Sequence, residues 1–220
     1  MQQLQKEKQP SRFRKKAVRL LDSARKSTRR MLMLPKKRKA LDSAFLDAAK
    51  KGDNEETKRL LNAGANIEAK DNDGMTPLMY AAWNGHTQTC EFLLEHNANI
   101  EAKDNLGRTA FMIAAEEGHT QTCALLLEHN ASVDEKNNDG WTPLMHAALR
   151  GHTQTCAFLF EHNADIEAKD NDGWTPLIWS AWRGHTQTVQ FLKSMESLQE
   201  SLGKENYKEF MKSFGECIGG

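Results

Sequence analysis

Histidine and cysteine recur at a fixed spacing in this chain, and they are the residue types best suited to metal or acid–base chemistry. Three series have a spacing of 33 residues: His86, His119, His152 and His185; His96, His129 and His162; Cys90, Cys123 and Cys156. Zinc holds a histidine nitrogen at about 2.0–2.1 Å, and equivalent groups of successive units lie too far apart to share an ion. No serine–histidine–aspartate spacing or phosphate-cradling glycine loop accompanies them. We therefore expect no enzymatic activity, no metal and no cofactor.

The three periodic cysteines are predicted to be small buried hydrophobic residues. Stacked helices lie about 8–10 Å apart, whereas a disulfide requires Cα atoms within about 7 Å of each other. Cysteines at equivalent places in successive units should therefore stay reduced. This indicates a reducing compartment, so we expect an intracellular protein in the cytoplasm, the nucleus or both.

The spacing of 33 residues belongs to a block that is written almost identically three times. The copies begin at Asp71, Asp104 and Asn137, and a fourth copy that begins at Asp170 departs from the pattern near its end. One unit of this size cannot bury its apolar face alone, so a fixed period of this kind is typical of a stacked solenoid. Such a fold favours an extended binding surface over a catalytic pocket.

Each copy contains the start and stop signals of two helices. Thr76 and Pro77 begin the first helix, because a threonine oxygen caps free backbone N–H groups and proline fits the first turn. Gly85 ends that helix, and the second helix stops near Asn97, since both residues tolerate the left-handed conformation of a helix end. The residues 71–74 that precede them should form a tight turn.

This arrangement resembles the ankyrin repeat. The residues that carry the resemblance are Gly74, Thr76, Pro77, Leu78, Ala81, Ala82, Gly85, His86, Leu93, Leu94, Asn97, Ala98 and Asn99, with their counterparts in the other copies. The resemblance implies an all-α solenoid of about five stacked helix–turn–helix units with short β-turn fingers. The family's usual histidine after Thr-Pro-Leu is replaced by Met79, Met112, Met145 and Ile178. We expect apolar packing between units there in place of a hydrogen bond.

We predict three regions: a basic arm at 1–37, the repeats at 38–195, and a helical cap or tail at 196–220. The repeat units are expected near 38–70, 71–103, 104–136, 137–169 and 170–195. Solenoid ends need polar caps, and Ser180 and Lys193 replace apolar residues of the earlier copies. The apolar stripe Tyr207, Phe210, Met211 and Phe214 is predicted to cover the end of the stack; docking onto another protein is the alternative.

Charge divides the chain into a basic arm and an acidic body. Residues 1–40 hold 15 Lys and Arg but only two acidic residues, whereas residues 41–220 hold 15 basic and 28 acidic residues. The run Lys36, Lys37, Arg38 and Lys39 resembles an extended nuclear import signal. The alternatives for the arm are membrane or organelle targeting, nucleic-acid binding through phosphates by residues 1–39, and a solvated tail. No apolar run is long enough for a membrane span, and no secretory signal is expected.

Positions that differ between the copies are free to serve a partner. They lie in the turn and at the end of the first helix, which in ankyrin proteins line the finger tips and the concave groove. Tryptophan and arginine, the types most enriched at binding hot spots, gather there. The predicted partner-binding residues are Met75, Tyr80, Trp83, Asn84, Arg108, Glu116, Glu117, Trp141, His146, Arg150, Trp174, Trp179, Trp182 and Arg183.

Two of these assignments have plain alternatives. Bulky residues occur in the turns of ankyrin repeats whatever the partner, and Trp179 is also expected to pack partly against its neighbour. Glu116 and Glu117 either receive a basic residue of the partner or are solvated helix-end groups.

The expected function is that of a monomeric, non-enzymatic adaptor or scaffold that binds another protein on its concave groove. One alternative is a nuclear regulatory factor that contacts chromatin or nucleic acid through the basic arm. The other is an inhibitory subunit that masks the functional surface of its partner.

Overall fold

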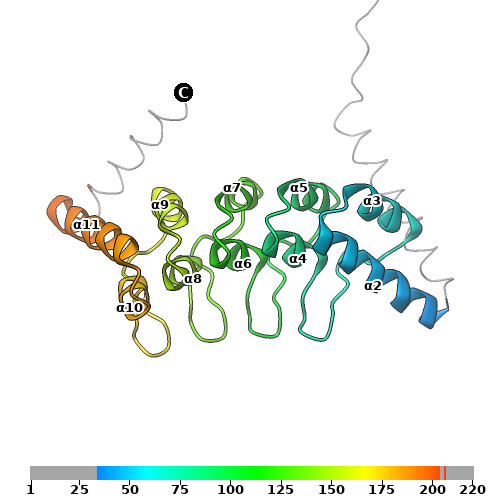
Figure 1. Ribbon diagram of the computed structural model, residues 1–220, viewed down its shortest axis with the longest axis horizontal. Coiled ribbons are helices and arrows are strands. Elements are labelled where there is room, and N and C mark those ends of the chain that lie inside the picture. Colours follow the sequence, from blue (N-terminus) through cyan, green and yellow to red (C-terminus); the bar gives the residue numbers. More distant parts are fainter. Residues whose placement is uncertain (1–33, 204–205, 207–220) are drawn as a thin grey trace, which may run out of the picture.

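The computed structural model describes residues 34–203 and Asn206, and within them ten helices form five antiparallel pairs (Figure 1). The first helices of the pairs are α2 (Pro35–Lys51), α4 (Pro77–Trp83), α6 (Ala110–Glu116), α8 (Pro143–Arg150) and α10 (Pro176–Trp182). The second helices are α3 (Asn54–Ala63), α5 (Thr87–Glu95), α7 (Thr120–Glu128), α9 (Thr153–Glu161) and α11 (Thr186–Leu202). No strand occurs in the described part of the chain.

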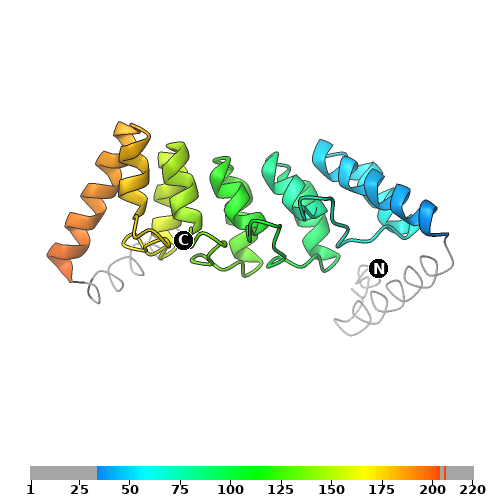
Figure 2. The ribbon, with the colours of Figure 1, turned by 90° about the horizontal axis from the view of Figure 1, so that it is seen from below.

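The pairs stack side by side into an elongated body, as the view from below shows (Figure 2). Each first helix packs against the next first helix and against its own second helix, so the helices form two layers. The loops that join the pairs project as fingers beyond the layer of first helices (Figure 1). The predicted all-α solenoid of helix pairs is therefore confirmed.

Threonine caps α4, α6, α8 and α10, and proline follows it in all of these except α6, as predicted. The side-chain oxygen of Thr76 accepts the backbone N–H of Met79 at 3.3 Å, and Thr142 caps α8 in the same way. The Sδ atom of Met79 in turn accepts the backbone N–H of Thr76 at 3.4 Å. This methionine is 1 % exposed, so it combines apolar packing between units with a local cap for its own helix.

Left-handed residues end the helices and redirect the chain. Gly85 has φ +67° after α4, and Asn97 has φ +66° after α5. Asn130 and Asn163 repeat the second of these conformations. Asparagine is the side-chain-bearing residue that tolerates it best, which explains why the copies keep asparagine at this place.

The invariant Gly-His-Thr segment joins each unit to its neighbour. The Nε2–H of His119 donates to the backbone carbonyl of Trp83 in the preceding unit at 2.9 Å. The hydroxyl groups of Thr120 and Thr155, one unit apart, are 2.8 Å from each other. These histidines therefore orient the backbone between units. No three His, Cys, Asp or Glu side chains in the described ranges converge as metal ligands.

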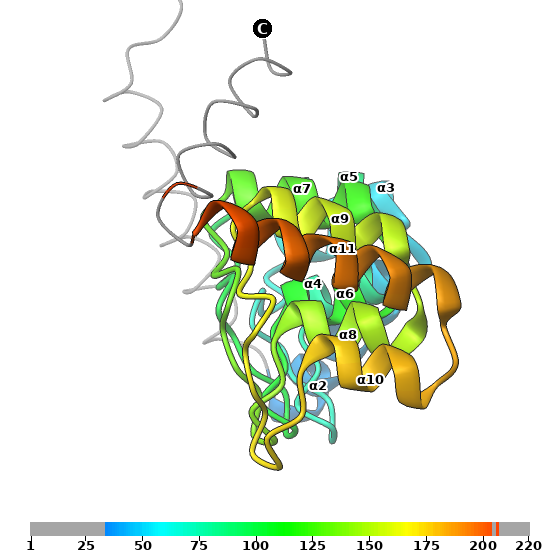
Figure 3. The same cartoon turned by 90° about the vertical axis from the view of Figure 1, so that its left-hand side faces the viewer.

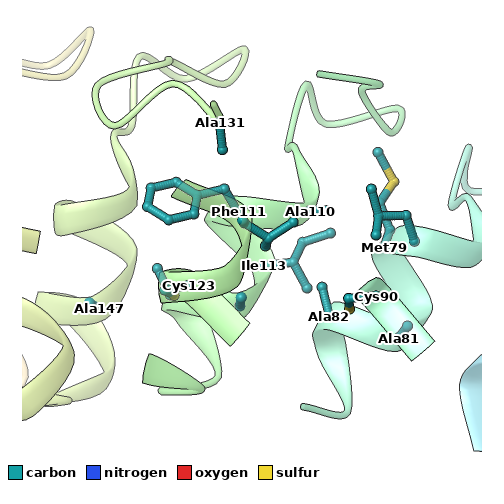
Figure 4. Close-up of a cluster of buried hydrophobic side chains, with 14 of the residues drawn as sticks. Met79, Ala81, Ala82, Cys90, Ala110, Phe111, Ile113, Cys123, Ala131 and Ala147 are labelled. Carbon is teal, nitrogen blue, oxygen red and sulfur yellow. The ribbon is translucent and has the colours of Figure 1, made fainter. Parts of the chain in front are cut away.

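The core is a continuous apolar layer between neighbouring units (Figure 4). Ile113 and Phe111 point to opposite sides of α6, Ile113 toward α4 and Phe111 toward α8. The free thiols of Cys90, Cys123 and Cys156 lie fully buried in this layer. Burial raises the pKa of each thiol to about 12, so all three stay protonated and act as small apolar groups.

The amino end of the stack begins a few residues before the expected boundary at residue 38. Helix α2 begins at Pro35, so Lys36–Lys39 form its first turns and are not the extended run that import signals present. Helix α11 continues past residue 195 to Leu202, and Gly203 ends it. In the described part of the chain no helix is long and apolar enough to cross a membrane. The arm residues 1–33 and the predicted stripe at 207–214 lie outside the described residues.

The prediction that Ser180 belongs to a polar end cap is wrong. Its side chain is fully buried, and its hydroxyl donates to the carbonyl of Leu177 in the same helix at 2.9 Å. Lys193, in contrast, is exposed on α11. The end of the stack is thus polar on α11 but not through the serine of α10.

Candidate functional site

The predicted contact residues lie on the fingers and first helices, which together form the inner surface of the stack. In three of the units, an aspartate at the start of the finger holds a variable side chain of this surface. Oδ1 of Asp71 accepts the backbone N–H of Met75 at 2.8 Å and fixes the turn. Oδ2 of Asp71 accepts the hydroxyl of Tyr80 at 2.5 Å. This hydrogen bond, together with burial, raises the pKa of Tyr80 to about 12.

The same aspartate position holds different side chains in other units. Oδ2 of Asp170 accepts the indole N–H of Trp179 at 2.9 Å. Oδ2 of Asp104 accepts the Nε–H of Arg108, also at 2.9 Å. One finger aspartate therefore shapes its turn with one oxygen and orients a variable inner side chain with the other.

The third full copy has Asn137 in place of this aspartate, and His146 is left without a hydrogen-bond partner. Both ring nitrogens of His146 are buried and unpaired, although Nδ1 lies 3.5 Å from an oxygen of Glu116. Burial lowers the pKa of His146 to about 4, so the ring is neutral at pH 7. The prediction that His146 contacts a partner needs correction, because its side chain is only 4 % exposed.

Met75 requires the same correction. It was predicted to contact a partner from the finger, but it is 2 % exposed. Its side chain belongs to the core cluster beneath the first finger. A position that varies between copies is thus not necessarily on the surface.

In the middle of the inner surface, the charged side chains form ion pairs with one another. Glu116 accepts from Nη1 of Arg108 at 3.1 Å and from Nη2 of Arg150 at 2.9 Å. Burial alone raises the pKa of Glu116, but the Arg150 hydrogen bond and the charge of Arg108 hold it below its usual value. Glu116 is therefore neither an open acceptor for a basic partner residue nor a solvated group. Glu117 is farther from Arg150, at 4.0 Å.

The amino-terminal part of the inner surface presents a small aromatic pair. The rings of Tyr80 and Trp83 are parallel within 3°, with centroids 6.3 Å apart. Nζ of Lys50 lies 5.1 Å from the centre of the Tyr80 ring. Trp83 is 43 % exposed, and Asn84 beside it is exposed and donates to the carbonyl of Tyr80.

Four tryptophans gather in the last two units. The ring centroids of Trp179 lie 4.4 Å from Trp141, 4.6 Å from Trp174 and 5.8 Å from Trp182. Trp141 also meets the edge of His146 at 5.2 Å. Trp179 packs against three other rings as well as bonding to the finger, so it holds the tryptophan cluster (Trp141, Trp174, Trp179 and Trp182) together.

An open pocket of about 630 Å³ adjoins this cluster. Its lining residues are Leu149, Arg150, Trp182, Arg183 and His185. The Arg183 guanidinium lies 5.4 Å from the Trp182 ring centre and forms no ion pair with the described residues. Trp182 is 61 % exposed, the largest value among the exposed tryptophans. The pocket thus combines an accessible indole with a guanidinium that has no acidic partner among the residues the structure describes.

Sequence reasoning missed three residues of this surface: Lys50, Leu149 and His185. Leu149 could have been predicted from the sequence, because it occupies the position of Trp83, Glu116 and Trp182 in the other copies. Lys50 belongs to the first unit, which lacks the repeat's opening residues and is hard to register. His185 has a counterpart in every copy, so no difference between copies marks it as a residue that also borders the pocket.

The family model described as ankyrin repeats (3 copies) matches the chain at residues 45–137 and 130–201. The matched residues include all of α3 to α10, the last part of α2 and nearly all of α11. A search among curated proteins finds no match.

Proposed function

Because this chain belongs to the ankyrin-repeat family, whose repeats are in general protein–protein interaction modules, we propose that it is a non-enzymatic adaptor. It binds a segment of another protein on the inner surface, and most of the binding energy comes from the last two units. The single observation that carries the proposal is the pocket in which exposed Trp182 lies beside Arg183, whose guanidinium forms no ion pair within the described part of the chain.

Trp182 and Arg183 are the residues whose burial would contribute most. Tryptophan and arginine dominate binding hot spots because they combine a large desolvated area with directional polar contacts. Arg108 is already paired with Asp104 and Glu116, and Arg150 is shared with Glu116. Arg183 can therefore pair with a partner without breaking an ion pair to any residue that the structure describes.

This arrangement favours a partner segment that places an apolar side chain next to an acidic one. The apolar side chain would lie against Trp182 and Leu149, and the carboxylate would meet the guanidinium of Arg183. A carboxylate is the natural bidentate partner of arginine. A basic segment would instead meet repulsion at this end of the surface.

The aromatic pair at Tyr80 and Trp83 provides a second contact for the same segment. Trp83 and Trp182 are three units apart, and helices stack about 8–10 Å apart, so about 27 Å separates the two contacts. An extended chain covers roughly 3.3 Å per residue. The proposed partner segment is therefore about eight to nine residues long.

Binding measurements on matched variants test the proposal. Partners captured by the full chain are identified, and the affinity of the recovered partner is measured for Trp182→Ala, Arg183→Ala and Glu161→Ala. Each of the first two substitutions should weaken binding about tenfold or more, since hot-spot truncations cost on the order of 2 kcal/mol. Glu161, at the end of second helix α9 and exposed, is the control and should bind normally.

Equal binding by all three variants would contradict the assignment of the surface. Far-UV circular dichroism identifies any loss that comes from misfolding. Trp182 is the most exposed tryptophan of the stack, so the first substitution leaves the core intact and the fold should persist.

We also propose an intracellular location, which the three buried free thiols support. Import into the nucleus through Lys36, Lys37, Arg38 and Lys39 would require the first turns of α2 to unwind. A fluorescent fusion in which these four residues are alanine tests that route. Loss of nuclear signal would support import through this run, whereas an unchanged distribution would exclude it.

A further inference from the structure

The outer face of the last unit is unlike the matching face of every full unit before it. Ile178 of α10 is 41 % exposed, whereas its counterparts Met79, Met112 and Met145 are at most 1 % exposed. Ala181 is also exposed, although the equivalent alanines of α4, α6 and α8 are fully buried. In the earlier units the next first helix covers these positions, so α10 presents a face built for burial.

The last unit also has the glycine and the finger carbonyl that contact the next unit elsewhere in the stack. A Cβ atom at Gly85 would lie 2.7 Å from the ring of His119 in the next unit, while one at Gly184 meets nothing within 4 Å. In the fingers, the side-chain amide of Asn138 donates to the carbonyl of Asn105, one unit earlier. The carbonyl of Asn171, the last in this series, receives no such bond from the described residues. The outer face of α10 is therefore that of an interior unit and not a polar cap.

We propose that residues 204–220 of this chain cover the outer face of α10, as the first helix of an incomplete sixth unit. These 17 residues follow directly on the last described helix. Tyr207, Phe210, Met211 and Phe214 recur at the three- and four-residue spacing that places apolar side chains on one side of a helix. The uncovered apolar face and the unpartnered apolar stripe thus occur next to each other in the same chain.

The point at which the described chain ends suits this arrangement. Helix α11 runs antiparallel to α10, so it ends on the side where α10 begins (Figure 3). A helix that doubles back after Gly203 runs parallel to α10, as α10 itself runs beside α8. It would occupy the place of the next first helix in the stack.

The segment is also long enough. Compared with α5, α7 and α9, helix α11 continues eight residues beyond the equivalent of their last residue, from Met195 to Leu202. At 1.5 Å per residue this carries the chain about 12 Å beyond the stack, and a returning helix recovers that distance in about eight residues. Phe210 and Met211 then reach the start of α10, and Phe214 reaches the level of Ile178.

The charged residues of the segment would give the end of the stack a polar exterior. Lys204, Lys208 and Lys212 alternate with Glu205, Glu209 and Glu216. A helix with the aromatic stripe turned inward directs most of these charges to solvent. The polar exterior that a solenoid end requires would then come from this segment and not from α10.

Hydrogen–deuterium exchange in the full chain tests the proposal. The double variant Phe210→Ser, Phe214→Ser should speed amide exchange in residues 176–192 by roughly tenfold or more, because burial of apolar area protects this end from local opening. Exchange in α4 and α6 should not change. The matched control is Lys208→Ser, Lys212→Ser, on the polar side of the same segment, and its exchange at 176–192 should stay like that of the parent chain.

Deletion of residues 204–220 provides a second measurement, which does not depend on how the double variant behaves. It should reproduce the faster exchange at residues 176–192. The proposal is overturned if deletion leaves exchange at 176–192 unchanged. It is equally overturned if protection in the full chain falls on dilution together with dissociation of a dimer, because a second copy would then be the cover.

Discussion

His146 shows how a single exchange in a repeat leaves a polar group without a partner. In the units that contain Tyr80 and Trp179, the finger aspartate supplies a second oxygen that accepts from the variable side chain. Asn137 supplies an amide nitrogen at that place, and the ring of His146 is buried without a hydrogen bond. Its folded-state pKa of about 4 is far below the ordinary value of 6.5, so acid should favour the unfolded chain, in which this histidine binds a proton more readily.

The pH dependence of unfolding tests this description. Because the folded pKa of His146 is depressed, the unfolded chain binds the proton more readily, and stability falls as the pH drops from about 6.5 toward 4. At pH 5 the loss relative to pH 7 should be on the order of 2 kcal/mol. The variant His146→Ile, which copies the residue of the preceding unit, should lack this part of the acid loss.

Chemical denaturation of both proteins at pH 7 and pH 5 measures the difference. The groups that face His146 are Glu116, Arg108, Arg150 and Asp104. The pKa of Glu116 is lowered, so it stays ionised above pH 5 and does not mimic the effect. Parallel pH profiles for the parent and His146→Ile would show that His146 is not the group responsible.

At the level of the elements, the glycine after each first helix serves both the helix end and the next unit. Gly85 and Gly184 have nearly equal φ angles, +67° and +75°. Only Gly85 is approached by the histidine of a following unit. A substitution at Gly184 therefore measures only the strain of a left-handed backbone. The same substitution at Gly85 measures that strain together with the disturbed contact between units.

Alanine substitutions at these two positions should lower the free energy of unfolding by different amounts. Gly184→Ala should lower the free energy of unfolding by about 1–2 kcal/mol through backbone strain alone. Gly85→Ala should cost at least about 1 kcal/mol more, since the His119 ring must move and its hydrogen bond to Trp83 is lost. Urea unfolding measures both; equal costs would mean that the histidine contact contributes little to stacking.

The helices could be predicted from the sequence because their signals are local. Thr76 and Pro77 begin a helix and Asn97 ends one through their own backbone chemistry, whatever surrounds them. The site was harder to predict, because burial of Met75 and His146 depends on side chains of other units. The pairing of Glu116 with Arg150 crosses from one unit to the next, and no pattern within a single copy contains it.

On the scale of the whole molecule, the inner surface changes character from one end to the other. Tyr80 and Trp83 form a small aromatic pair near the amino end, and the ion pairs of Glu116 occupy the middle. The tryptophan cluster and the Trp182–Arg183 pocket lie at the carboxyl end. Because the units share nearly one sequence, these few variable side chains determine where a partner gains binding energy.

Site-specific photo-crosslinking tests this central claim most directly. A photoreactive leucine analogue is placed at position 149, which lines the pocket, and a photoreactive residue is placed in a second protein at position 161, at the end of α9. We predict that one partner protein crosslinks through position 149, and that an excess of Trp182→Ala chain competes for it poorly. Crosslinking of that partner through position 161 and not through 149 would contradict the account.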